Sequence, residues 1–124
     1  MLEKGLSAQS TTTVVAENTA VQMGSGDMAV FATPAMVALM ENAAMQAVAP
    51  HLEAGMTTVG SEMNTSHIKP SGLGATITAT AVLTAVEGRK LTFTVGARDA
   101  EGLIGEGVHV RFVVDRERFM QKVK

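Results

Sequence analysis

Residues 31–49, FATPAMVALMENAAMQAVA, decide the fold that this sequence predicts. Thr33 is a good helix N-cap, and Pro34 suits the first helical position because its missing N–H would be unpaired there anyway. Alanine, methionine and leucine, all strong helix formers, then dominate until Pro50 ends the pattern. A helix that is apolar all round is normally buried on several sides. The stretch therefore predicts a long core helix that ends near Ala49.

One carboxylate, Glu41, lies inside this apolar helix and is followed by Asn42. Burying an ionised carboxylate costs several kcal/mol unless it is paired or hydrogen-bonded. The position therefore predicts either a partner for Glu41 or a functional use of its burial. The alternative is that Glu41 lies at a boundary with solvent or with another subunit.

Segments on both sides of the helix have the composition of strands. Residues 7–15 are rich in β-branched side chains and suit an opening strand. Residues 57–69 form the next candidate, which ends where Pro70 begins a turn. Apolar and polar residues then alternate through three further segments, 75–86, 90–98 and 103–114.

This alternation predicts a sheet with one covered face. Alanines on the inner side of segment 75–86 leave room for a helix to lie close. The last segment has apolar residues on one face, namely Val108, Val110, Phe112 and Val114. Its other face carries the polar residues His109 and Arg111. We expect the apolar set to face the core.

A strand, a long helix and four consecutive strands form an α+β architecture, the hot-dog plan. We predict a single domain over residues 1–124, with one long buried helix wrapped by a five-stranded antiparallel sheet. Such a sheet has exposed edges that favour pairing with a second copy. We expect a homodimer, with a tetramer as the alternative.

Composition excludes several functions. The chain has 124 residues, a formal net charge of −2 and no cysteine, which argues against general nucleic-acid binding and excludes disulfides and cysteine nucleophiles. No signal peptide or membrane-spanning run is present, so we expect a cytoplasmic protein without membrane association. Residues 69–124 carry nine bases against six acids. This half could bind an anionic ligand, or the charges could simply be solvated.

Three residues could form a catalytic group: Thr33, Glu41 and His67. Thr33 and Glu41 are eight positions apart, about 12 Å along a helix axis, so their side chains cannot meet directly. A histidine between them could contact both, as in a hydroxyl–imidazole–carboxylate relay that takes a proton from a hydroxyl or from water. His67 precedes Pro70 at the end of a strand, from which a side chain can reach the mouth of a cleft.

Each of these residues also has a simpler interpretation. Thr33 is compatible with a helix cap alone, and a lone histidine is a weak signal. Metal binding by His67, His109 and Glu41 is not expected because none of the known metal-site spacings is present. The glycine pairs do not form a phosphate loop, and no nucleophile elbow occurs.

Four separated motifs together resemble the fluoroacetyl-CoA thioesterase family of hot-dog proteins. They are Phe31-Ala-Thr-Pro-x-Met-x-x-Leu-Met-Glu41-Asn-Ala-Ala, Val59-Gly60…Asn64-Thr-Ser-His67-Ile-Lys-Pro70, Gly88-Arg-Lys-Leu-Thr-Phe93 and Gly105-Glu-Gly107…Arg111. The resemblance covers nearly the whole chain, and the combined pattern is much more specific than any one motif.

The resemblance implies hydrolysis of an acyl-CoA thioester by Thr33, Glu41 and His67. His67, oriented by Glu41, would activate Thr33 or a water molecule. The resemblance further implies that the backbone N–H of Gly60 holds the thioester carbonyl and that Arg111 lies near the active site. Coenzyme A would enter as part of the substrate, and no separate cofactor is implied. Whether Thr33, Glu41 or water is the nucleophile stays open.

The segment before the helix departs from the family pattern. The fluoroacetate-specific member closes its pocket with phenylalanines there, whereas residues 20–29 contain no aromatic residue. We therefore do not expect fluoroacetyl-CoA specificity, and predict a small to medium aliphatic acyl group. The alternative function is a non-catalytic acyl-CoA- or CoA-binding module, with a hot-dog hydratase or dehydratase as a more distant one. The presence of all three catalytic candidates favours the enzyme.

Overall fold

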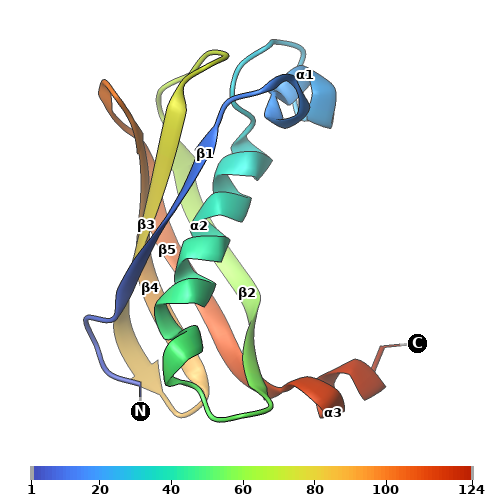
Figure 1. Ribbon diagram of the computed structural model, residues 1–124, viewed down its shortest axis with the longest axis vertical. Helices are drawn as coiled ribbons and strands as arrows, with labels where there is room; N and C mark the ends of the chain where they lie inside the picture. Colours follow the sequence, from blue (N-terminus) through green and yellow to red (C-terminus); the bar gives the residue numbers. More distant parts are fainter. Residues whose placement is uncertain (1, 124) are drawn as a thin grey trace.

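The computed structural model describes residues 2–123 and contains one antiparallel sheet and one long helix (Figure 1). The five strands lie in the order β1-β3-β4-β5-β2, so β1 and β2 form the two edges. Their bounds are β1 Ser7–Thr13, β2 Met56–His67, β3 Thr76–Glu87, β4 Lys90–Asp99 and β5 Gly102–Asp115. The predicted order of one strand, a helix and four strands is confirmed.

The long helix α2, Thr33–Val48, lies along the inside of the curved sheet (Figure 1). Alanines on the inner face of β3, Ala79 and Ala81, are fully buried, and their small side chains let the helix approach closely. The predicted room for a close helix is confirmed. A single-turn helix, Ala49–His51, follows α2 directly.

The helix is buried on one face only, so the prediction of burial on several sides is wrong for the single chain. The face toward the sheet is fully buried and consists of Met36, Met40, Ala43, Ala44, Ala47 and Val48. Ala38 and Met45 are exposed on the opposite face, and Glu41 is half-buried between the two. The partly apolar exposed face explains why the sequence pattern looked uniformly buried.

Strand β5 presents the opposite face to that expected. His109 and Arg111 are buried, and of the apolar set expected to face the core only Val110 is buried with them, whereas Val108 and Phe112 are 44% and 37% exposed. The cause lies earlier in the strand, where a Cβ on Gly105 would be 2.7 Å from the sulfur of an α2 methionine. Only a glycine fits there, so this residue must face α2, and the period of two then turns His109 and Arg111 inward.

Short helices complete the fold. Residues Ala16–Asn18 form one 3₁₀ turn, and Ala20–Met23 form α1, which ends at Gly24 in the left-handed conformation at φ 81°. The terminal helix α3, Arg116–Gln121, begins where the Asp115 carboxylate accepts a hydrogen bond from the backbone N–H of Arg118. The sequence pattern did not predict these helices. Among residues 2–123, no helix has the length and apolar character needed to span a membrane.

Candidate active site

The hydroxyl of Thr33 and the imidazole of His67 are in direct contact. Thr33 Oγ1 lies 2.8 Å from His67 Nδ1, which joins the first residue of α2 to the last residue of β2. Thr33 does not act as the predicted N-cap: Ala32 occupies that position, and no side chain caps the helix. The threonine hydroxyl is therefore free to bond the histidine.

The Thr33–His67 pair lines a hollow of about 270 Å³ beneath α1 and the segment that follows it. Its other walls are largely apolar and include Ala20, Val30, Phe31, Ile68 and Pro70. Burial lowers the pKa of His67 below 6.5, and the nearby backbone of Lys69 opposes this shift in part. The imidazole is therefore neutral near pH 7, as a general base must be.

The second ring nitrogen of His67 lacks a partner. Nε2 is buried and has no hydrogen-bond partner among the described residues. Buried polar atoms are usually paired, so an orphaned one points to a missing group. If Nδ1 accepts the Thr33 hydroxyl proton, Nε2 carries the N–H and requires an acceptor.

Glu41 lies at a different place, above Gly60 and beside Arg111. A Cβ built on Gly60 would be 3.1 Å from Glu41 Oε2, 3.2 Å from His109 Cε1 and 3.4 Å from Arg111 Nη1. Gly60 is thus the point on which three polar side chains converge. Glu41, Gly60 and Arg111 line a second hollow of about 430 Å³ on the exposed side of α2, and His109 does not line it.

Arg111 is held rigidly in the sheet by its neighbours. Its Nε donates to Thr58 Oγ1 at 2.8 Å, and its Nη2 donates to the Thr58 carbonyl at 3.0 Å. Nη1 lies 3.2 Å from His109 Nε2. Burial lowers the pKa of Arg111, and the nearby charge of Glu41 opposes that shift.

His109 is locked in one neutral tautomer. Its Nδ1 lies 2.7 Å from the Glu62 carbonyl oxygen, which can only accept, so Nδ1 carries the hydrogen and Nε2 accepts from Arg111. Burial is the main cause that lowers the pKa of His109, and the charge of Arg111 lowers it further. The imidazole thus acts as a fixed acceptor that orients the guanidinium.

The single chain therefore forms two groups of site residues. Thr33 and His67 form one, and Glu41, Gly60 and Arg111 form the other. The two hollows share no lining residue, and no hydrogen bond joins His67 to Glu41 within residues 2–123. The predicted contact of His67 with the Thr33 hydroxyl is thus present, whereas the predicted contact of His67 with the Glu41 carboxylate does not form within one subunit.

Two residues that hold Arg111 of the second group were missed as functional residues in the sequence. His109 was considered only as a metal ligand, and Thr58 was not considered. The available signal was that His109 and Arg111 are two positions apart on one strand and so share a face. Over the described part of the chain, no group of three or more His, Cys, Asp or Glu side chains could hold a metal ion.

The sequence matches a family model described as "Fluoroacetyl-CoA-specific thioesterase" over residues 14–117. A fluoroacetyl-CoA thioesterase from Streptantibioticus cattleyicolor is 44% identical over 95 residues, which are 77% of this chain and 68% of that protein. The chain belongs to the fluoroacetyl-CoA-specific thioesterase family. The predicted family and the predicted class of enzyme, a thioester hydrolase, are confirmed.

Solved structures support the same assignment. The fluoroacetyl-CoA thioesterase FlK superposes with a TM-score of 0.90 at 36% identity, covering 99% of this chain and 96% of that one. A thioesterase superfamily member from Thermus thermophilus gives a TM-score of 0.90 at 26% identity, covering 98% and 90%. A hot-dog-like protein from Thermanaerovibrio acidaminovorans, 22% identical with a TM-score of 0.88 and covering 98% and 90%, shares the fold. The predicted α+β hot-dog fold is confirmed.

Proposed function

We propose that this protein hydrolyses a short- to medium-chain acyl-CoA to the free acid and CoA. The observation that carries the proposal is the 2.8 Å contact between Thr33 Oγ1 and His67 Nδ1, with the pKa of His67 lowered by burial. A neutral imidazole in contact with a hydroxyl is the arrangement that removes a proton during nucleophilic attack. Because the chain belongs to a thioesterase family, the bond that the activated hydroxyl attacks is a thioester.

In the proposed mechanism, His67 Nδ1 accepts the proton of the attacking hydroxyl, from Thr33 or from a water molecule in its place. Attack on the thioester carbonyl gives a tetrahedral oxyanion, whose collapse expels the CoA thiolate. Gly60 and Arg111 line the other hollow of the same subunit, so in the dimer proposed below the backbone N–H of Gly60 that stabilises the oxyanion, and the positive charge of Arg111 beside it, come from the second subunit. The thiolate takes the proton from His67. When water is the nucleophile this releases the acid directly; when Thr33 is the nucleophile, His67 next activates a water molecule that hydrolyses the acyl-Thr33 ester, which releases the acid and restores both residues.

We propose further that the enzyme acts as a homodimer in which Glu41 of one subunit accepts from His67 Nε2 of the other. Three observations support this: Nε2 is buried without a partner, Glu41 makes no hydrogen bond within residues 2–123, and β2, which carries His67, is an edge strand. The exposed face of α2 around Ala38 and Met45 supplies apolar area for such an interface. A tetramer of two such dimers is the alternative.

The acyl group is proposed to occupy the hollow beside Thr33. Its apolar walls and its volume of about 270 Å³ fit a small to medium aliphatic chain. We propose that the enzyme needs no cofactor besides the CoA of its substrate and that it works in the cytoplasm. Unchanged turnover after dialysis against a chelator would support the first point, and localisation of the tagged chain would test the second.

The decisive experiment measures free-thiol release from acyl-CoAs of increasing chain length. The parent is compared with Thr33→Ala, Glu41→Gln and His67→Ala. Loss of turnover in the His67 variant is expected, because His67 is the one neutral base among residues 2–123 that contacts the hydroxyl. Tight CoA binding without turnover by the parent would instead support the non-catalytic module.

Mixed dimers test the shared site. When Glu41→Gln and His67→Ala chains are combined, each mixed dimer contains one intact site if the two residues act across the interface. Activity should then return to roughly a quarter of the parent value, because half the dimers are mixed and each has one working site of two. No recovery in a sample shown to exchange subunits would refute the shared site, as would a clean monomer in gel filtration.

A further inference from the structure

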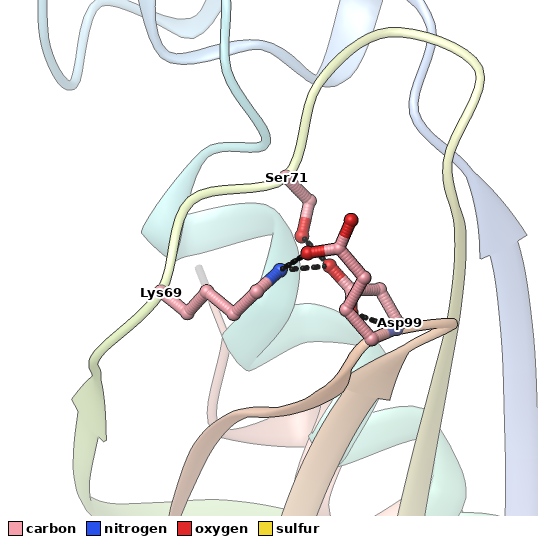
Figure 2. Close-up of polar contacts among 4 residues, drawn as sticks. Lys69, Ser71 and Asp99 are labelled. Carbon is pink, nitrogen blue, oxygen red and sulfur yellow. Dashed lines mark hydrogen bonds and ion pairs between the residues drawn. The ribbon is translucent and has the colours of Figure 1, made fainter.

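Asp99, the last residue of β4, binds three donors, of which Lys69 and Ser71 are labelled in Figure 2. It lies two residues beyond Ala97, which pairs with the same β5 residue, Gly105, as His67 does. Its Oδ2 accepts from Lys69 Nζ at 2.8 Å and from Ser71 Oγ at 2.9 Å, and its Oδ1 accepts from the Glu101 N–H at 2.9 Å. The Asp99 side chain is only 7% exposed. The hydrogen bond from Lys69 is the main cause that lowers the pKa of Asp99 to about 2, so the carboxylate is ionised at every pH at which the protein would be assayed.

The donors come from the segment that directly follows His67. Lys69 and Ser71 are two and four residues beyond it, on either side of Pro70. His67 is the final residue of β2, so the sheet holds the chain on one side of it only. The Asp99 contacts hold the other side, together with a hydrogen bond from the Ile68 N–H to a carbonyl of β5.

The same segment also holds the chain that presents Thr33. The carbonyl of Ser71 accepts a hydrogen bond of 2.9 Å from the Phe31 N–H, two residues before Thr33. Phe31 is 1% exposed and anchors the start of α2 in the core. One carboxylate therefore fixes, through Ser71 and Lys69, both chain segments that meet in the Thr33–His67 contact.

We propose that Asp99 is a positioning residue that holds His67 against Thr33 through Lys69 and Ser71. The inference rests on the proposed hydrolysis, in which His67 is the base. Misplacing a catalytic group by 1 Å can cost about 100-fold in rate. A contact made by two segments that are far apart in the sequence depends on such supporting hydrogen bonds. Lys69 is also the charged residue among those that line the hollow around His67.

The test compares kcat, KM and the pKa of the His67 ring in Asp99→Asn with the parent. We expect kcat to fall about tenfold with KM changed by less than about twofold, since orientation is lost and not binding. The ring pKa, followed by NMR and assigned with His67→Ala, should rise toward 6.5 as the released segment admits water. Lys69→Arg should keep the ion pair and retain near-parent kcat, whereas Lys69→Gln should behave like Asp99→Asn.

Asp115→Asn is the matched control. Asp115 also accepts a backbone N–H, at the start of α3, but lies outside the hollow around His67. Unchanged kcat and His67 pKa in folded Asp99→Asn would overturn the proposal, as would equal losses in the Asp115 variant. If Asp99→Asn does not fold, the Lys69 pair carries the same test. The NMR readout needs no turnover, so failure of the positioning role is distinguishable from failure of the proposed function.

Discussion

Adding one methyl group at Gly60 should disturb the part of the site formed by Glu41 and Arg111. The new Cβ would be 3.1 Å from Glu41 Oε2 and 3.2 Å from His109 Cε1. Unstrained contacts between carbon atoms are about 3.5–4.0 Å, so a shift of a few tenths of an ångström is required. His109 cannot yield because it is fully buried and bonded to the Glu62 carbonyl and to Arg111. Glu41, which is half-buried, must therefore move.

The expected loss in the free energy of unfolding of Gly60→Ala can be compared with that of the same substitution at Gly96. Overpacking costs about 1–3 kcal/mol, while replacing a strand glycine by alanine returns about 0.5–1 kcal/mol in the free energy of unfolding. Gly60→Ala should thus be destabilised by about 1–2 kcal/mol. Gly96→Ala on β4 is the control, because its Cβ would meet nothing closer than a carbonyl oxygen at 3.8 Å. It should be neutral or slightly stabilised.

The assays are thermal melting by circular dichroism, since the chain has neither tryptophan nor tyrosine, and thiol release from an acyl-CoA. Gly60→Ala should melt about 3–8 °C below the parent and lose about tenfold in kcat, because the Glu41 carboxylate is displaced. Gly96→Ala should match the parent in both. Equal melting temperatures and equal turnover for the two variants would refute the crowded geometry around Gly60.

Three further predictions concern the buried polar groups and the helix contact. Arg111→Lys should lower the free energy of unfolding by about 2–3 kcal/mol in urea titrations, since lysine cannot make both bonds to Thr58; a smaller loss than about 1 kcal/mol would contradict the network. Because the pKa values of His67 and His109 are lowered in the folded state, the unfolded chain binds more protons below pH 6.5. The melting temperature and turnover should both fall as the pH drops below 6.5, and a flat melting profile down to pH 5 would argue against buried neutral imidazoles. Gly105→Ala should lower the melting temperature more than Gly60→Ala, because its Cβ would be 2.5 Å from the backbone carbonyl oxygen of Ser66, which cannot move aside, and 2.7 Å from a methionine sulfur of α2; calorimetry of the two variants compares their melting temperatures.

The helix and the strands were predictable because their signals are local. The Thr-Pro start and the run of strong helix formers placed α2 within one residue of its observed bounds, Thr33–Val48. The alternation in 75–98 predicted β3 and β4 with the correct inner faces. The motif pattern likewise led to the right family, because the combination of four separated motifs over nearly the whole chain is much more specific than any one of them.

The sequence by itself determined the order of the long helix and the five strands, their bounds to within about two residues, and which side chains could act as base, hydroxyl and carboxylate. Only the tertiary structure decided that His109 and Arg111 face inward, since both faces of β5 carry apolar residues and the close contact of Gly105 with α2 selects one of them. It also decided that His67 meets Thr33 while Glu41 lies over Gly60. These contacts join residues far apart in the chain, so they depend on the order and curvature of the sheet, which local periodicity does not encode.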